Sequence, residues 1–228
     1  RITMEALSLG ASDFVLKPSE PSGSEMSLVA DQLTQRLKAY GGRHRSGQPK
    51  SSSSPLDMGS ASSGAAATIA PRRRQRGDKV EAVALGISTG GPNALRHVFS
   101  EIDPDLSVPV LVVQHMPAGF TLEFAASLDR LSPLSVKEAE EGDVLKPGRV
   151  FIAPGGYHMA VTKRRLATTI RLSEDDPVNV HRPSADVLFS SMCAAYNNRV
   201  LGIIMTGMGR DGAKGLGEIY RAGGTTVA

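Results

Sequence analysis

The sequence is poor in cysteine, tryptophan and long apolar runs. It has one cysteine, Cys193, and no tryptophan among 228 residues. A single thiol excludes an intrachain disulfide, which fits a reducing compartment. No apolar run approaches the roughly 20 residues that a membrane-spanning helix needs, and the first residues lack the apolar core of a signal peptide. These absences predict a cytoplasmic protein that does not insert into a membrane.

The sequence also lacks a folded basic surface, although its net charge is +3. Residues 43–79 hold eight Lys and Arg against two acidic residues, so this segment carries +6 and the remainder of the chain −3. The segment is rich in serine, glycine and alanine and has no hydrophobic periodicity, which predicts a flexible basic linker. We therefore expect no nucleic-acid partner.

Histidine is scarce as well. None of the five histidines stands at an i, i+2 or i, i+4 spacing from another. With a single cysteine, the sequence predicts no zinc or other metal site. His158 and His181 fall in loops or at strand ends, where they could line a site.

Residues 1–42 contain one short apolar strand and two helical pieces, too little to build a core. The segment Gly10–Pro18 resembles the last strand of a response-regulator receiver domain, in which a lysine followed by proline points at the phosphorylated aspartate. This resemblance implies that residues 1–42 are the C-terminal remnant of a receiver domain and that Lys17 is its lysine. On spacing alone, Lys17 is equally well a solvated strand end.

Strand and helix patterns alternate from residue 80 onward. This alternation predicts an α/β domain over residues 80–228, with a doubly wound, mostly parallel sheet and helices on both faces. Three shorter extended pieces, around 149–153, 157–161 and 166–172, predict a small antiparallel insertion. A strand that only begins at residue 225 suggests a domain that is C-terminally incomplete.

Polar turns follow three of the expected buried strands. Ser88 lies after the first strand, His115 after the second, and Asp211 after the strand over residues 200–205. In a parallel sheet the carboxyl ends open on one edge, so these residues can converge. A hydroxyl, an imidazole and a carboxylate are what acyl transfer requires.

Each of these residues also has a simpler interpretation. Ser88 could cap the helix that opens at Pro92 or contact a phosphate, since the surrounding G-x-S-x-G string is short and matches often by chance. His115 alone is more often a hydrogen-bonded structural histidine. Asp211 alone is more often a turn residue capping the helix that begins nearby.

Six motifs together resemble the chemotaxis-type protein-glutamate methylesterases, the CheB family. In the order that the family has them, they are Gly86–Pro92, Gln114–Pro117, Ile152–Gly155, His158–Met159, His181–Phe189 and Thr206–Ala213. Such an ordered set is far more specific than any one motif.

The resemblance implies an architecture of receiver, linker and esterase. By the same resemblance Ser88 is the nucleophile, His115 the general base and acid, and Asp211 the orienting acid. Met208 supplies an oxyanion donor through its backbone amide, and Thr89 and His181 line the site. The substrates would be glutamyl methyl esters of chemoreceptors, with deamidation of receptor glutamines as a second activity. The receiver would connect the enzyme to a histidine kinase, and no cofactor is implied.

Two departures from the family and two rival functions remain. Most of a receiver is absent from this sequence, and the family normally continues beyond the position of Ala228. A nucleotide- or phosphate-binding module is one rival, although Gly86–Gly91 lacks both the G-x-G-x-x-G spacing and the Gly-Lys-Ser/Thr ending of a P-loop. The other rival is a signalling adaptor with an inactive esterase-like domain.

Overall fold

The computed structural model describes residues 33–34 and 79–228. The predicted receiver remnant with Lys17, apart from residues 33–34, lies outside the described residues, and so does the predicted linker apart from Lys79. Everything that follows concerns the described part of the chain.

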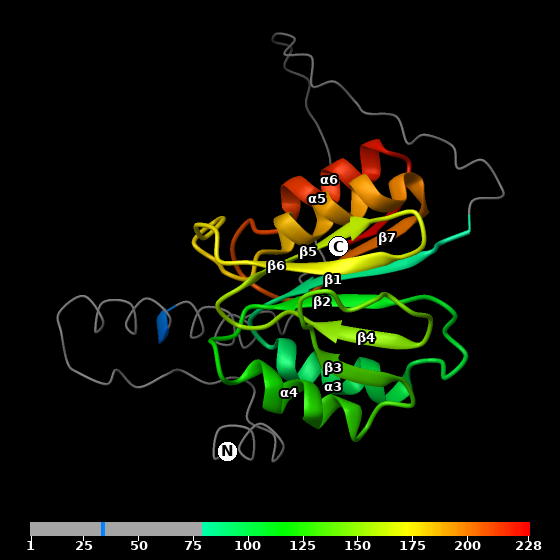
Figure 1. Ribbon diagram of the computed structural model, residues 1–228. Coiled ribbons are helices and arrows are strands. Elements are labelled where there is room, and N and C mark those ends of the chain that lie inside the picture. Colours follow the sequence, from blue (N-terminus) through cyan, green and yellow to red (C-terminus); the bar gives the residue numbers. More distant parts are fainter. Residues whose placement is uncertain (1–32, 35–78) are drawn as a thin grey trace, which may run out of the picture.

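A six-stranded parallel sheet forms the centre of the molecule (Figure 1). Its strand order is β3-β4-β2-β1-β7-β8. In chain order the strands are β1 (Ala82–Ile87), β2 (Val110–Gln114), β3 (Ser135–Glu138), β4 (Arg149–Ile152), β7 (Val200–Ile204) and β8 (Thr225–Val227).

Helices cover both faces of this sheet. Figure 1 shows α3 and α4 on one face, and α5 and α6 on the other together with a separate two-stranded antiparallel sheet of β5 and β6. The elements on the two faces are α3 (Gly91–Glu101), α4 (Thr121–Asp129), β5 (His158–Lys163), β6 (Thr168–Ser173), α5 (Ala185–Tyr196), which runs into the 3₁₀ turn η2 (Asn197–Arg199), and α6 (Ala213–Arg221). None of the helices in the described residues is long and apolar enough to cross a membrane.

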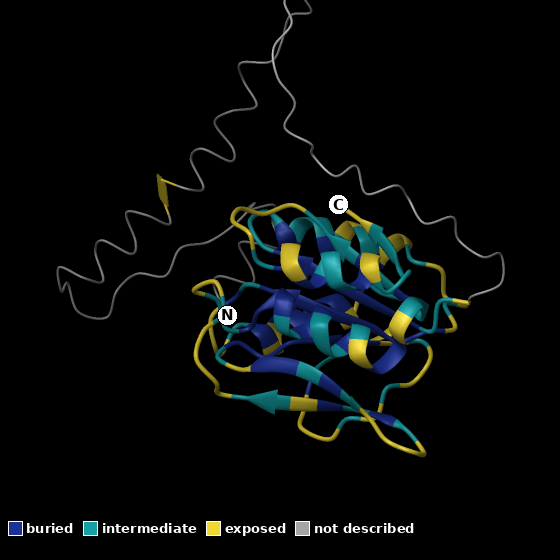
Figure 2. Cartoon of the chain, turned by 90° about the horizontal axis from the view of Figure 1, so that it is seen from above, coloured by how far each residue is buried: buried dark blue, intermediate teal, exposed yellow. Residues whose placement is uncertain are grey.

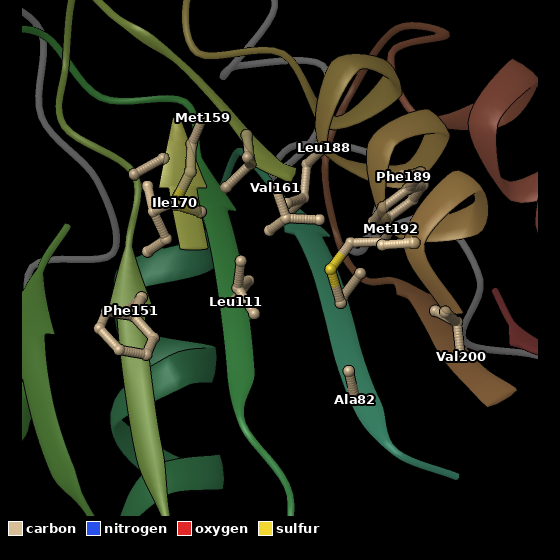
Figure 3. Packing of buried hydrophobic residues seen from close by; sticks show 14 of the residues in the cluster. Ala82, Leu111, Phe151, Met159, Val161, Ile170, Leu188, Phe189, Met192 and Val200 are labelled. Atoms are coloured by element: carbon tan, nitrogen blue, oxygen red, sulfur yellow. The ribbon is translucent and has the colours of Figure 1, made fainter. Parts of the chain in front are cut away.

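The alternating side-chain sizes of β1 explain how the two layers differ. Val83, Leu85 and Ile87 point into the apolar cluster beneath α3 and α4, whereas Ala82 and Ala84 face the cluster beneath α5. Successive strand residues face opposite sides of a sheet, so the small residues share the α5 face. Figure 3 shows this face packed with Leu188, Phe189 and Met192 from α5 and with Met159, Val161 and Ile170 from β5 and β6.

Glycine at position 86 continues the small face of β1 and lets α5 begin close to the sheet. A Cβ added there would lie 2.9 Å from the Cβ of Ala185, the first residue of α5. The start of α5 is therefore set directly against the end of β1.

The strands of the domain are largely buried, while the outer turns of the helices and the loops are exposed (Figure 2).

The predicted fold class is confirmed, with one change to the insertion. The sheet, the helices on both faces and the small antiparallel pair are all present. However, the segment around 149–153 is wrong as part of the antiparallel insertion, because β4 pairs in parallel with both β2 and β3. Its residues Val150, Phe151 and Ile152 are buried on both faces, as expected of a central parallel strand.

The contact between α5 and α6 depends on Gly215. A Cβ at this position would lie 2.6 Å from the Cβ of Phe189 and 3.1 Å from the carbonyl oxygen of Asp186, both on α5. Gly217, in the same helix, would place a Cβ in open space, with its nearest neighbour the Arg221 guanidinium at 4.0 Å. The two glycines lie two residues apart in the same helix, but only Gly215 is in close contact with α5.

We expect Gly215→Ala to lower the free energy of unfolding by about 1–3 kcal/mol, because backbone and Cβ atoms must shift to admit the methyl group. Gly217→Ala should raise it by up to about 1 kcal/mol, because alanine favours the helix without a clash. Urea unfolding of both variants tests this pair. Equal effects of the two substitutions would contradict the close contact at Gly215.

Candidate active site

Ser88, His115 and Asp211 lie at the carboxyl ends of three neighbouring strands. Ser88 directly follows β1 and His115 directly follows β2, while Asp211 closes the turn between β7 and α6. Strand β1 lies between β2 and β7, and the chain runs from β1 to one side of the sheet and later returns on the other. Such a switch in strand order opens a crevice at the carboxyl edge, which is where α/β proteins bind ligands.

Backbone hydrogen bonds and close packing fix the corner at Ser88. Its amide donates to the carbonyl of Thr206 (3.0 Å), and its carbonyl accepts from the amide of Gly91 (2.8 Å), which opens α3. Gly207 packs directly on the corner, since a Cβ there would lie 2.9 Å from the Cβ of Ser88. The turn after β7 therefore lies against the serine, and only glycine permits that approach.

The side chain of Gln114 links the serine to the histidine. Its amide nitrogen donates to the carbonyl oxygens of both Ser88 and His115, each at 3.1 Å. Its own oxygen is buried without a hydrogen-bond partner in the described residues, and it lies against Gly91, where a Cβ would come within 1.8 Å. One buried amide thus sets the spacing between the ends of β1 and β2.

His115 and Asp211 form a buried hydrogen-bonded pair. Nε2 of His115 lies 2.8 Å from a carboxylate oxygen of Asp211, and the two side chains are only 13% and 2% exposed. Because an ionised carboxylate can only accept, Nε2 carries the proton in this contact. The other ring nitrogen, Nδ1, is then left with a lone pair. It is buried and has no hydrogen-bond partner within the described residues.

Asp211 sits at the start of α5 and serves as its cap. The amides of Ala185 and Asp186 donate to its two oxygens at 2.7 and 3.3 Å. The Ser184 hydroxyl (2.6 Å) and the Asn179 side-chain amide (3.1 Å) also donate to it. The first amides of a helix have no partner within the helix and carry partial positive charge, so they favour a carboxylate there.

These donors decide the charge of Asp211. Burial alone would raise the pKa of the carboxyl group, but the hydrogen bonds from His115, Ser184, the Ala185 amide and Asn179 lower it by more, so the pKa lies well below its ordinary range. Asp211 is therefore ionised at neutral pH, although its side chain is almost fully buried.

A second histidine lies on the ring of His115. The His181 ring is stacked on it, with centroids 3.8 Å apart and planes 10° from parallel. Burial lowers the pKa of His181, and repulsion from His115 when that ring is protonated lowers it further, against the opposing effect of Asp211. His181 is consequently neutral at pH 7.

A pocket of about 100 Å³ opens beside the three predicted residues. Ser88, His115 and Asp211 all line it, together with the turn after β7, including Gly207 and Met208. Met208 is 39% exposed, and its amide has no hydrogen-bond acceptor within the described part of the chain. The other two predicted lining residues, His181 and Thr89, are not among the residues that line this pocket. His181 contacts the ring of His115 instead, and Thr89 is the residue after Ser88.

The remaining titratable groups do not assemble into a metal site. No group of three or more His, Cys, Asp or Glu suited to a metal occurs among the described residues. His158 is buried, and its Nε2 lies 3.1 Å from the carbonyl of Asp176, in the loop that carries His181. His158 therefore helps to hold that loop.

Sequence patterns did not assign roles to Gln114, Asn179 and Ser184. Gln114 offered one signal, a polar residue ending an otherwise apolar strand. Helix α5 begins directly after Ser184, and the carboxylate that caps it comes from Asp211, 27 positions further along the sequence. Local patterns cannot reveal a cap that arrives from another element.

Known proteins resemble this chain along its length. The family described as CheB methylesterase matches residues 83–228. The protein-glutamate methylesterase/protein-glutamine glutaminase of Treponema denticola is 46% identical, with 100% of this chain and 64% of that protein covered. Its counterpart in Treponema pallidum is 42% identical, with 100% and 66% covered. The chain thus spans just under two thirds of the length of these relatives.

A solved structure is similar to the described domain. The crystal structure of the Thermotoga maritima CheB methylesterase catalytic domain aligns with a TM-score of 0.64 and 39% sequence identity, covering 65% of this chain and 78% of that one. At this identity the likeness extends to sequence as well as to fold.

We expect Asp211→Asn to flatten the loss of stability in acid. The lowered pKa means that the carboxylate contributes stability above the unfolded pKa of about 4 and loses it as the pH falls further. Urea unfolding from pH 6 to pH 3 should show a shallower decline for the variant, with a loss of about 1–3 kcal/mol at pH 6. Asp105→Asn, at an exposed position, is the matched control. A decline as steep as in the parent protein would contradict the assignment.

Proposed function

The chain belongs to the CheB methylesterase family, and on that premise we propose that it hydrolyses γ-glutamyl methyl esters of chemoreceptors with Ser88 as the nucleophile. The observation that carries this proposal is the pair of His115 and ionised Asp211, held 2.8 Å apart in a pocket that Ser88 also lines. This pair is what converts a serine hydroxyl into a nucleophile.

The geometry favours Nδ1 of His115 as the base. Nε2 already donates to Asp211, so Nδ1 is the nitrogen with a free lone pair. The described residues contain no hydrogen bond from the Ser88 hydroxyl to this nitrogen, and such contacts often tighten only when substrate binds. Ser88 gives its proton to Nδ1 as Oγ attacks the ester carbonyl, and Asp211 stabilises the resulting imidazolium.

The rest of the reaction follows from the same groups. His115 returns the proton to the departing methoxy oxygen, methanol leaves, and a γ-glutamyl ester on Ser88 remains. Water then attacks this acyl-enzyme with His115 as base and frees the glutamate carboxylate. The negative charge on the tetrahedral oxygen needs amide donors, and we assign them to Met208, whose amide has no acceptor among the described residues, and Thr89, which follows the nucleophile.

Deamidation of receptor glutamines uses the same acyl-enzyme. With an amide substrate, the proton from His115 goes to the leaving nitrogen and ammonia departs. The relatives bear the name glutaminase as well as methylesterase, so we propose both activities.

The wider setting is proposed from the family alone. Chemoreceptors would be the protein substrate, a histidine kinase would act through the receiver domain, and the enzyme would work in the cytoplasm. The rival phosphate-binding function has little support, because no Lys or Arg is among the residues that line the pocket in the described chain, whereas Asp211 is. An ionised carboxylate there disfavours an anion. The other rival, a signalling adaptor, would not hydrolyse esters, so a measurement of Ser88-dependent ester hydrolysis distinguishes it from the proposed enzyme.

Ser88→Ala should lower ester hydrolysis by about 10⁴-fold or more, because it removes the proposed nucleophile. The other hydroxyl that lines the pocket, that of Thr206, donates to the carbonyl of Thr89. The measurement is release of labelled methanol from receptors carrying methyl esters. Ser100→Ala, which removes an exposed hydroxyl on α3, should leave the rate unchanged. Methanol release that persists in the Ser88→Ala protein would refute a serine mechanism.

Asp211→Asn should lower kcat by up to about 10⁴-fold, because the amide cannot hold His115 in the tautomer that leaves Nδ1 free. We expect the Michaelis constant to change little, since both oxygens of Asp211 are engaged by His115 and the start of α5 and are not needed to bind the substrate. Steady-state kinetics at pH 7–8 test this expectation. A variant with near-normal kcat would show that the carboxylate does not orient the base.

A further inference from the structure

The ring of His115 is held at one edge and on one face. Its Nε2 edge is fixed by the hydrogen bond to Asp211, and its face by the parallel ring of His181, 3.8 Å away. The hydrogen bond alone still permits small rotations of the ring about its Cβ–Cγ bond, because a hydrogen bond tolerates a spread of donor directions. Rotation of this kind would carry Nδ1 away from Ser88. The stacked ring opposes it, since rotation would drive one edge of His115 into His181.

The backbone at His181 is held in a tight turn. Its amide donates to the carbonyl of Val178 (2.9 Å), and its carbonyl accepts from the amide of Val178 (3.1 Å). The two residues between them, Asn179 and Val180, have positive φ values of 51° and 63°. Val180 is 88% exposed, so burial does not offset the cost of this conformation for a β-branched residue. Strain of this type is found where a turn must hold a functional group in place.

The same loop holds the carboxylate. Asn179 donates to Asp211 and to Asp186 (3.1 and 2.8 Å), two residues before His181 reaches His115. Arg182 directs its guanidinium to the carbonyls of Glu174 and Asp175 within the loop. One tight turn therefore contacts both partners of Ser88.

The charges around His181 suit a neutral stacking partner. The ionisable groups that act on it are His115, across the stack, and Asp211, from the turn before α6. The carboxylate of Asp186, on α5, accepts hydrogen bonds from the Asn179 side chain and the Gly215 amide. Burial lowers the pKa of His181, and repulsion from His115 when that ring is protonated lowers it further. When His115 takes up the Ser88 proton, it meets the face of a neutral aromatic ring, a favourable contact for a cation.

We propose that His181 is a positioning residue, whose flat ring keeps the plane of His115 oriented so that Nδ1 faces Ser88. This inference rests on the proposed serine esterase function and adds a residue that acts through the base. The required property is a flat ring of this size, and neither a proton nor a hydrogen bond from His181 takes part.

Three substitutions separate a flat ring from bulk and from polarity. Phenylalanine keeps a flat ring but cannot take up a proton, leucine keeps apolar bulk without a flat face, and alanine removes both. We expect His181→Phe to retain kcat within about threefold. His181→Leu and His181→Ala should lower it by on the order of 10- to 100-fold, the scale of a misplaced catalytic group. The Michaelis constant should stay within a few-fold in all three.

Ring-current shifts provide a readout that does not depend on activity. Proton resonances of the His115 ring should be shifted upfield in the parent protein and in His181→Phe, and should lose that shift in the leucine and alanine variants. His97→Ala, at a histidine that is 75% exposed on α3, is the control and should change neither the His115 resonances nor kcat.

The outcomes distinguish the inference from the function on which it rests. Equal kcat values for the phenylalanine, leucine and alanine variants of an active parent protein would overturn the positioning role alone. A phenylalanine variant as impaired as the alanine variant would also overturn it, because the polar ring and not its flat face would then be required. A parent protein without Ser88-dependent hydrolysis would overturn the proposed function together with this inference.

Discussion

The ionised carboxylate of Asp211 at the start of α5 is the interaction on which the site depends. It accepts hydrogen bonds from two helix amides, two side chains and His115. Hydrogen bonds from His115, Ser184, the Ala185 amide and Asn179 keep the buried carboxylate charged, and a charged carboxylate fixes which ring nitrogen of His115 carries a proton. The capping of a helix and the tautomer of a histidine on another strand are therefore one electrostatic arrangement.

That arrangement requires α5 to begin close to the ends of β1 and β7. The side chains of β1 are small on this face, and Gly86 lets Ala185 approach to a distance that a methyl group would prevent. Gly207 likewise brings the turn after β7 against Ser88. Large residues on the opposite face of β1 supply the apolar packing that these small residues cannot. One face of β1 thus supplies apolar packing against α3 and α4, and the other face allows α5 to approach closely.

The sequence was sufficient to predict the fold class and the convergence of Ser88, His115 and Asp211, because strand ends in a parallel sheet meet at one edge. It misplaced β4, whose short apolar run resembles a hairpin strand as much as a central one. It could not assign Gln114, Asn179 or Ser184, since their contacts with Ser88, Asp186 and Asp211 span 7 to 32 positions. His181 was named only as a lining residue, and its ring stack depends on a tight turn that no local pattern announces. Contacts of this kind arise from tertiary packing.

The turn between β7 and α6 has little freedom to change in length. It seats Asp211 on the first amides of α5, packs Gly207 against Ser88, and forms the pocket wall at Met208. One additional residue would displace the carboxylate relative to all its donors at once. The hairpin between β5 and β6 is different, because its tip at Leu166 is fully exposed. Natural variation in length should therefore accumulate at that hairpin, while the turn before α6 keeps its residue count.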